Sequence, residues 1–75
     1  MVVYTADGCG LCEPALEVVR EVQAELQFEL DVVDIAGDAE LETLYRAHLP
    51  VVEIDGERAF VHFVDAGALR ERLAG

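Results

Sequence analysis

Residues 4–13 read YTADGCGLCE and contain both cysteines of the chain. The run just before them, Val2–Thr5, is rich in β-branched and aromatic residues and predicts a short strand, which ends at a turn-prone ADG sequence. After Cys12, apolar residues recur three or four positions apart, which predicts a helix with one buried stripe. Pro14 is tolerated only in the first turn of a helix, so we expect this helix to begin between Cys9 and Leu11. The stripe consists of Ala15, Leu16, Val19, Val22 and Leu26. The cysteines are therefore predicted to lie where a strand passes into a helix.

The middle of the chain predicts a second strand and a second helix. A strand is expected over residues 28–35, where apolar and acidic residues alternate. A helix follows, opened by Gly37 and Asp38 and ended by Pro50. The strand at 2–5, the helix after Cys12 and the strand at 28–35, in that order, predict a right-handed parallel βαβ unit. Leu41, Leu44, Tyr45 and His48 are expected to share one face of this helix.

The last third of the chain predicts a hairpin and a final helix. Asp55-Gly56 is a two-residue hairpin signal between strands expected at 51–54 and 58–63. Asp65 is placed to cap the helix that follows, and Val64 and Leu69 are spaced to meet across that cap. The expected order is β-α-β-α-β-β-α, an α/β fold in a single domain spanning residues 1–75.

The composition argues against several classes of function. The 16 acidic and 5 basic residues give a formal net charge of −11, whereas nucleic-acid binders need clustered lysine and arginine. The chain has no lysine, which removes Schiff-base and P-loop chemistry. No apolar run approaches the roughly 18 residues of a membrane span, and the N-terminus shows no basic secretory leader. We therefore expect a cytoplasmic protein that binds neither nucleic acid nor membrane.

The spacing of Cys9 and Cys12 favours redox chemistry. At the start of a helix, unpaired amides and the helix dipole stabilise a thiolate, which is the attacking species in disulfide exchange. We therefore assign Cys9 as the nucleophile. Cys12, one turn later on the same face, is placed to attack the resulting mixed disulfide from within the chain. Gly10 leaves the approach to the sulfur open, and Leu11 offers a substrate an apolar contact.

Three other interpretations of the cysteines stay open. A structural disulfide would close a loop too short to add much stability. A zinc site would need two further ligands, and the only histidines, His48 and His62, lack a zinc-finger spacing, so we assign no metal ligand. The cysteines could also be buried and unreactive.

Residues 4–13, together with Leu49-Pro50-Val51-Val52 and Asp55-Gly56, resemble the small glutaredoxin-like proteins of the thioredoxin superfamily, in particular their bacterial branch with a C-x-L-C motif. The resemblance covers nearly the whole chain in its element order. It implies a thioredoxin-like fold with a four-stranded mixed sheet, the first and third helices on one face and the second helix on the other. It also implies a cis peptide bond before Pro50, facing Cys9, and substrate-binding backbone groups at Leu49 and Pro50.

Some positions depart from the glutaredoxin pattern. Where that family has a basic residue before the first cysteine, which helps to hold glutathione, this chain has Ala6-Asp7-Gly8. His48-Leu49 replaces a Thr-Val pair, and Val64-Asp65-Ala66-Gly67 replaces a Gly-Gly pair followed by an acid. We therefore expect no tightly bound cofactor, and the binding of glutathione or of an iron–sulfur cluster stays open.

Three residues near the motif are expected to modulate the thiols. Asp7 and Glu13 should disfavour a thiolate at Cys9 through like charge. His48 is a candidate proton carrier for Cys12 or a cation beside Cys9. It is alternatively a helix-end residue that interacts with the last carbonyls.

Two classes of function follow from these features. The first is a thiol–disulfide oxidoreductase acting on a disulfide-containing protein or small molecule, with glutathione or a reductase as its reductant. This class includes a dedicated electron donor to one reductase, for which the charge of −11 would select a basic docking face. The second is a binding module of the same fold whose cysteines hold a metal, an iron–sulfur cluster or a sulfur-transfer partner.

Overall fold

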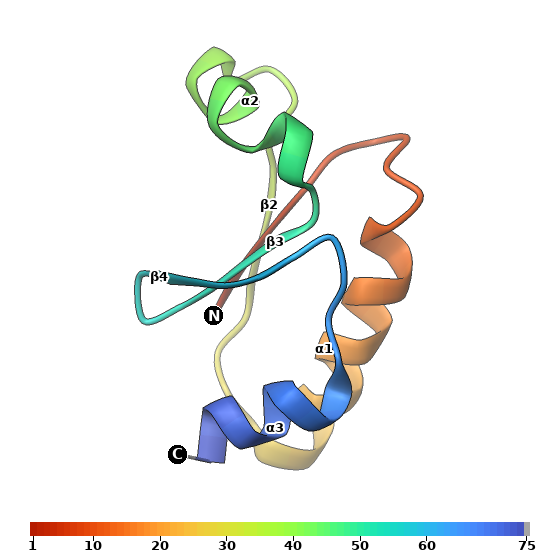
Figure 1. The fold of residues 1–75 in the computed structure, drawn as a ribbon, viewed down its shortest axis with the longest axis vertical. Coiled ribbons are helices and arrows are strands. Elements are labelled where there is room, and N and C mark those ends of the chain that lie inside the picture. The colour runs from red at the N-terminus through yellow and green to blue at the C-terminus, as the bar shows by residue number, and fades with distance from the viewer. Residues whose placement is uncertain (75) are drawn as a thin grey trace.

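Within residues 1–74, the part of the chain that the structure describes, four strands form one sheet in the order β2-β1-β3-β4, and three α-helices pack around it (Figure 1). The structure is a computed structural model. The predicted order of strands and helices is confirmed, with an added 3₁₀ turn, η1. The single domain expected over residues 1–75 stays a prediction, and Gly75 lies outside the described residues. The elements are β1 (Val2–Thr5), α1 (Cys12–Leu26), β2 (Asp31–Asp34), α2 (Ala39–Tyr45), η1 (Arg46–His48), β3 (Val51–Ile54), β4 (Glu57–Val61) and α3 (Ala66–Ala74).

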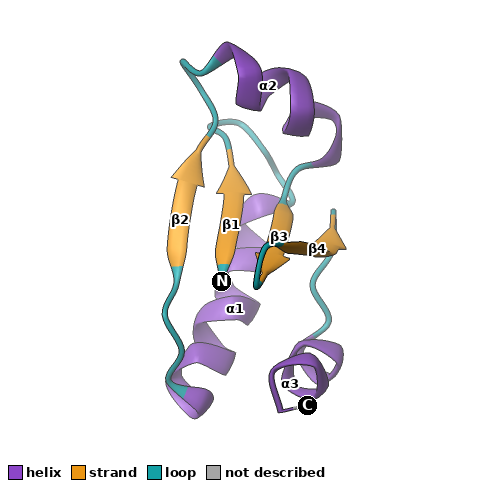
Figure 2. Cartoon of the chain, turned by 90° about the vertical axis from the view of Figure 1, so that its left-hand side faces the viewer, coloured by secondary structure: helices purple, strands orange, loops and turns teal. Residues whose placement is uncertain are grey.

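The sheet is mixed, as predicted. β1 runs parallel to β2 and antiparallel to β3, and β3 pairs antiparallel with β4 (Figure 2). The parallel register sets Thr5, at the end of β1, opposite Asp34, at the end of β2. Asp55 and Gly56 form the turn between β3 and β4, and both have positive φ angles, 53° and 81°. These angles are typical of a two-residue hairpin turn.

β4 contains a bulge that the sequence did not predict. Glu53 pairs with Arg58, whereas Val52, the residue before it, pairs with Phe60, so Ala59 is an extra residue in the strand. One extra residue reverses the side of the sheet that later residues face. The bulge therefore determines the side on which the chain leaves β4.

α1 and α3 cover one face of the sheet. Val19 and Val22 of α1 and Leu69 of α3 pack with residues of β1 and β3 in the main core. Of the stripe predicted for α1, Ala15, Val19 and Val22 are buried and Leu16 is partly buried, but Leu26 at the end of the helix is 46 % exposed. Leu69 is the buried residue of α3. Figure 2 shows α1 behind the sheet and α3 below it. The main core consists of Val3, Val19, Val22, Val52, Ile54 and Leu69.

α2 packs against the opposite side of the sheet, at one end. Successive strand residues point to opposite faces, so Tyr4 points away from Val3. The ring of Tyr4 stacks on Tyr45 of α2, with centroids 4.2 Å apart. A second, smaller cluster joins this region to the cysteines. It contains Ala6, Cys12, Ile35 and Leu49, with Tyr4, Cys9, Leu41 and Tyr45 partly buried against it.

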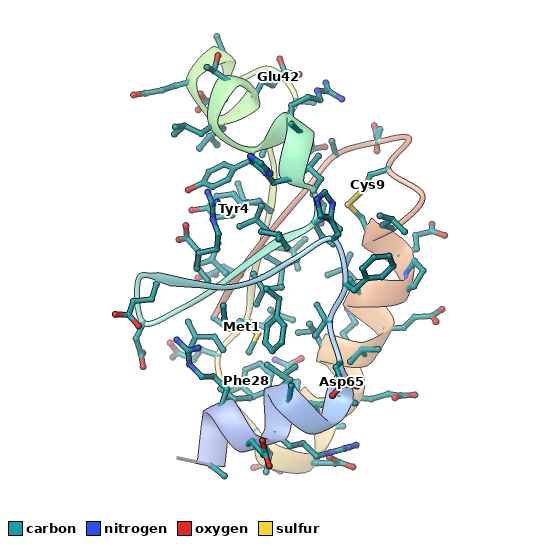
Figure 3. All side chains as sticks on the ribbon, viewed as in Figure 1. Met1, Tyr4, Cys9, Phe28, Glu42 and Asp65 are labelled. Atoms are coloured by element: carbon teal, nitrogen blue, oxygen red, sulfur yellow. A yellow bond between two sulfur atoms is a disulfide. The ribbon has the colours of Figure 1, made fainter. Side chains whose placement is uncertain are left out.

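Two aspartates cap the later helices. Asp38 Oδ1 accepts hydrogen bonds from the backbone N–H groups of Glu40 and Leu41, each at 3.1 Å. Asp65 Oδ2 accepts one from the N–H of Ala68 at 2.8 Å, and Figure 3 shows Asp65 where α3 begins. Both caps match the sequence prediction, because a carboxylate can satisfy the first amides of a helix locally.

Three predicted boundaries are wrong. α1 begins at Cys12 rather than between Cys9 and Leu11. β2 covers 31–34 rather than 28–35, because its partner β1 has four residues and the ladder cannot extend beyond them. β4 spans 57–61 rather than 58–63, because His62 has a φ of 67°, outside the β region.

Two large apolar side chains among the described residues are more than half exposed, and one of them, Leu44, lies on the helix face predicted from the sequence. Leu44 is 55 % exposed and Phe63 is 72 % exposed. α2 is seven residues long and has no fully buried residue, so Leu44 does not join a common buried face. His48 is also exposed, because it lies in η1 after α2 has ended. Of the predicted face, Leu41 and Tyr45 reach the second cluster.

Candidate active site

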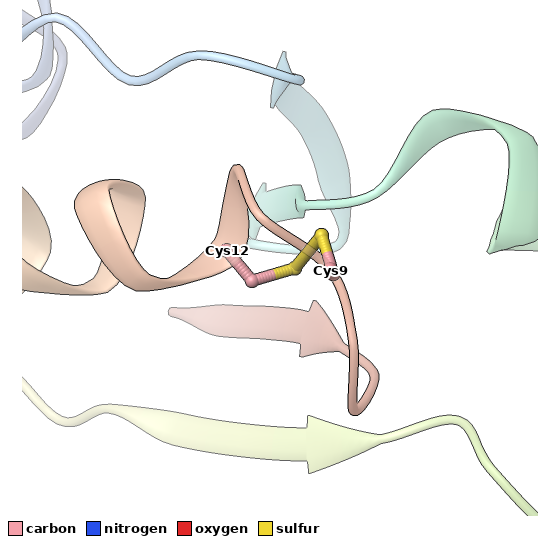
Figure 4. Close-up of a disulfide and its surroundings, with 2 residues drawn as sticks. All are labelled: Cys9 and Cys12. Atoms are coloured by element: carbon pink, nitrogen blue, oxygen red, sulfur yellow. A yellow bond between two sulfur atoms is a disulfide. The ribbon is translucent and has the colours of Figure 1, made fainter.

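Cys9 and Cys12 are joined by a disulfide at the N-terminal end of α1 (Figure 4). Their Cα atoms are 5.5 Å apart. Cys12 is the first residue of α1 and is 3 % exposed, whereas Cys9 lies in the preceding loop and is partly exposed. The two sulfurs therefore differ in their access to a substrate.

Backbone hydrogen bonds fold the loop before α1 into tight turns. The N–H of Cys9 donates to the carbonyl of Ala6 at 3.3 Å, and the N–H of Cys12 donates to the carbonyl of Cys9 at 3.2 Å. Gly8 has a φ of 80°, which glycine adopts at little cost. Cys9 thus lies one turn ahead of the helix rather than within it, near the positive end of the helix dipole.

Leu49 and Pro50 lie beside the disulfide. Their peptide bond is cis, and Leu49 is 7 % exposed and packs in the same cluster as both cysteines. Figure 4 shows the chain entering β3 beside the disulfide. The carbonyl of Pro50 accepts a hydrogen bond from the N–H of His62 at 2.9 Å. The hairpin thus engages the carbonyl of Pro50.

One side of the disulfide is a cleft of about 450 Å³ lined by acidic residues. Asp7 and Glu13, the two predicted acidic modulators, are exposed here. Asp34 joins them from the end of β2, and its Oδ1 accepts from the N–H of Ala36 at 2.8 Å. Sequence reasoning missed Asp34. The parallel pairing of Thr5 with Asp34 brings it to the cleft, and that register is not visible in the residues themselves.

A second hollow is an apolar groove between α1 and the chain that leaves β4. Leu11 lines this groove and is 39 % exposed, and its contact with a substrate stays a prediction. Gly10 is exposed beside it and also lines the acidic cleft. The groove is completed by Pro14, Ala15, Val18, His62, Phe63 and Val64.

His48 and His62 lie close together, with ring centroids 6.3 Å apart. Sequence reasoning treated them separately, because 14 positions divide them in the chain. The hairpin brings His62 opposite Pro50, two residues after His48. A tight turn closed by the N–H of Phe63 and the carbonyl of Val61, at 2.7 Å, holds His62 in its left-handed conformation. Both imidazoles therefore belong to the region of Leu49 and Leu11.

A tyrosine pair attaches α2 to the sheet. The hydroxyls of Tyr4 and Tyr45 both donate to the carboxylate of Glu53, at 3.4 and 3.0 Å. The guanidinium of Arg58 lies 5.9 Å from the centre of the Tyr45 ring. The hydrogen bond to Glu53, assisted by partial burial and by the carboxylate charge, raises the pKa of Tyr45 to about 12.

Replacing Tyr45 with phenylalanine is expected to reduce the loss of stability at high pH. Because the pKa of Tyr45 rises from 10 to about 12 on folding, the folded state holds this proton more tightly than the unfolded state does. The stabilisation of the folded state by this proton is complete below pH 10 and is lost as the pH rises towards 12. Urea unfolding at several pH values across this range should show a smaller decline for Tyr45→Phe. The control variant Tyr4→Phe keeps the hydrogen bond between Tyr45 and Glu53 and should retain the decline in stability. Equal declines in both variants would contradict the assignment of this pH dependence to Tyr45.

Comparison with known proteins assigns the family. Residues 1–74 match the family described as Glutaredoxin-like domain (DUF836). The chain belongs to this glutaredoxin-like family. It is 30 % identical to uncharacterized proteins of Mycobacterium bovis and Mycobacterium tuberculosis, over 96 % of this chain and 79 % of theirs.

Solved structures support the same assignment for this glutaredoxin-like chain. It is similar to a protein from X. campestris known from an X-ray structure, with a TM-score of 0.80, 32 % identity, and coverage of 97 % of this chain and 93 % of that one. It is also similar to a Nitrosomonas europaea protein solved by NMR, with a TM-score of 0.76, 32 % identity, and coverage of 95 % and 86 %. The predicted thioredoxin-superfamily fold is confirmed.

The cleft beside Cys9 in this glutaredoxin-like chain is lined by the acidic residues Asp7, Glu13 and Asp34, and none of the described residues that line it is a lysine or an arginine. Within residues 1–74, no three or more histidine, cysteine or acidic side chains are grouped so that they could hold a metal ion. Across the same residues, no helix has the length and apolar character to cross a membrane.

Proposed function

We propose that this chain is a thiol–disulfide oxidoreductase in which Cys9 is the nucleophile and Cys12 is the resolving thiol. The observation that carries the proposal is the disulfide between a partly exposed Cys9 and a buried Cys12 at the start of α1. Membership of the glutaredoxin-like family supports a redox role for this pair.

The reaction begins when Cys9, as a thiolate, attacks one sulfur of a substrate disulfide. A bond forms between Cys9 Sγ and that sulfur, the substrate disulfide bond breaks, and the leaving sulfur takes up a proton. Cys12 then loses its proton and attacks Cys9 Sγ, which forms the intramolecular disulfide and releases the second substrate thiol. The substrate gains two electrons and two protons, which the two cysteines give up. A thiol reductant, either glutathione or a reductase, regenerates the dithiol.

The surroundings of the disulfide act on the thiolate in opposite directions. The first amides and the dipole of α1 favour a negative charge on Cys9. Asp7 and Glu13, exposed around the same cleft, oppose it through like charge. His48, with His62 beside it, is a candidate to carry the proton that leaves Cys12.

The substrate docks around Cys9. Gly10 leaves the approach to the sulfur open, and Leu11 presents an apolar surface. The backbone of Leu49 pairs with an extended substrate segment, while buried Pro50 fixes the position of that backbone. A disulfide-containing protein or small molecule fits these contacts.

Counting thiols tests the proposed function. The reduced protein is mixed with insulin or an oxidised dithiol reagent, and we expect substrate disulfides to be reduced while the chain loses both of its thiols. The matched control is the double variant Cys9→Ser, Cys12→Ser. Substrate reduction at the same rate by both proteins would refute the proposal.

Metal analysis distinguishes the alternative of a metal-binding module. The protein is purified under reducing conditions and its zinc and iron content is measured. Stoichiometric metal without disulfide exchange would favour the module. We propose no step through a metal, because the described residues do not gather a donor set.

A further inference from the structure

The cleft beside Cys9 carries charge of one sign. Asp7 comes from the loop before the disulfide, Glu13 from the first turn of α1 and Asp34 from the end of β2. Both cysteines line the same cleft, so a molecule that reacts with Cys9 approaches these three carboxylates. No described residue lining the cleft carries a compensating lysine or arginine.

The groove between α1 and the chain that leaves β4, which Leu11 also lines, has a different character. Leu11, Val18, Phe63 and Val64 provide apolar surface there, and His62 is the polar residue among the groove-lining side chains. Both cysteines line the acidic cleft and neither lines the apolar groove, so the residues that flank a substrate cysteine at Cys9 meet the carboxylates.

We propose that the acidic cleft selects disulfide substrates with a basic residue beside the reacting cysteine, and that it disfavours anionic disulfides such as oxidised glutathione. This inference rests on the proposed exchange activity and adds its substrate class. Opposite charge lowers the energy of the encounter with a lysine or arginine side chain, and like charge raises the energy of the encounter with a carboxylate. The occupant of the cleft is thus a polypeptide segment with a lysine or arginine next to its cysteine.

Two matched peptide disulfides test this substrate class. One peptide has lysine on both sides of its cysteine and the other has glutamate, and each is presented as its disulfide-linked dimer to the fully reduced protein. Flanking charges also change the intrinsic reactivity of a disulfide. Each rate is therefore divided by the rate at which an uncharged small dithiol reduces the same peptide. We expect the corrected rate to be about ten-fold higher for the lysine peptide at low salt, and the ratio to fall as salt rises.

Two triple variants separate the cleft from the net charge of the molecule. The cleft variant carries Asp7→Asn, Glu13→Gln and Asp34→Asn, and we expect its ratio to approach one. The control variant carries Glu29→Gln, Glu40→Gln and Glu71→Gln, at exposed positions outside the cleft lining. It removes the same three charges, and we expect it to keep the ratio of the natural chain. The single variant Glu13→Gln, at an exposed position, should change the ratio in the same direction if the triple variant does not fold.

The outcomes separate this inference from the proposed function. A ratio near one in the natural chain, or the same ratio in both triple variants, would overturn the substrate class while leaving exchange activity intact. A failure to react with either peptide, when the small dithiol reduces both, would overturn the exchange activity and the substrate class together.

Discussion

Serine in place of Cys12 is expected to leave the protein covalently bonded to its substrate through Cys9. Cys9 is partly exposed and can still attack a disulfide, but the buried thiol that completes the reaction is absent. A thiol held next to its target reacts as if present at about 10⁵ M or more. External thiols at millimolar concentration cannot replace it, so release of the substrate should slow by at least about a hundred-fold. Intact-mass spectrometry after mixing with a peptide disulfide measures the mixed disulfide.

The Cys9→Ser variant is the matched control for this experiment. Its remaining thiol, Cys12, is 3 % exposed. We expect this variant to form little mixed disulfide and to show background turnover. Accumulation of the mixed disulfide on Cys12 in the Cys9→Ser variant would mean that the two assigned roles are reversed.

Replacing Leu69 with alanine is expected to destabilise the whole domain. Leu69 is fully buried and is the residue through which α3 enters the main core. Truncating a buried leucine costs about 3 kcal/mol. A domain of 75 residues has a total stability of only about 4–11 kcal/mol. Urea unfolding should therefore show a much lower midpoint for Leu69→Ala than for the natural chain.

Leu73→Ala provides the comparison on the same helix. Leu73 is only partly buried against the core, so its truncation should cost about 1 kcal/mol. The ion pair of Arg70 with Glu25 also links α3 to α1, but both side chains are exposed and such pairs contribute little. Equal losses for Leu69→Ala and Leu73→Ala would show that α3 is not held mainly by Leu69.

Local signals in the sequence predicted most of the fold. The apolar stripe of α1, the Asp55-Gly56 turn and the caps at Asp38 and Asp65 each depend on residues a few positions apart. Such patterns act within one element, so the sequence alone indicates them. The boundaries of β2 depend instead on the length of β1, which is a property of the partner strand.

The candidate site was predicted only in part, because some of its residues are brought together by contacts between segments far apart in the chain. Cys9, Gly10, Leu11 and Cys12 are consecutive in the chain, so their proximity follows from the sequence. Asp34 reaches the cleft through strand pairing, and His62 approaches His48 through the hairpin. Exposure of Phe63 has a similar origin, because this residue follows the turn at His62 and not a continuing strand.

The extra residue at Ala59 has a consequence for the chemistry around the disulfide. Arg58 and Val61 pair with Glu53 and Val51, which lie two positions apart on one strand and therefore face the same side of the sheet. His62, the next residue, consequently turns towards α1, where it lines the groove beside Leu11. If the same residues paired without this bulge, Phe60 would pair with Val51, the sides of Val61 and His62 would be exchanged, and an aliphatic side chain would stand where the imidazole now does. The side of the sheet on which this imidazole lies is thus decided by the pairing of a strand whose turn lies at the far end of the sheet.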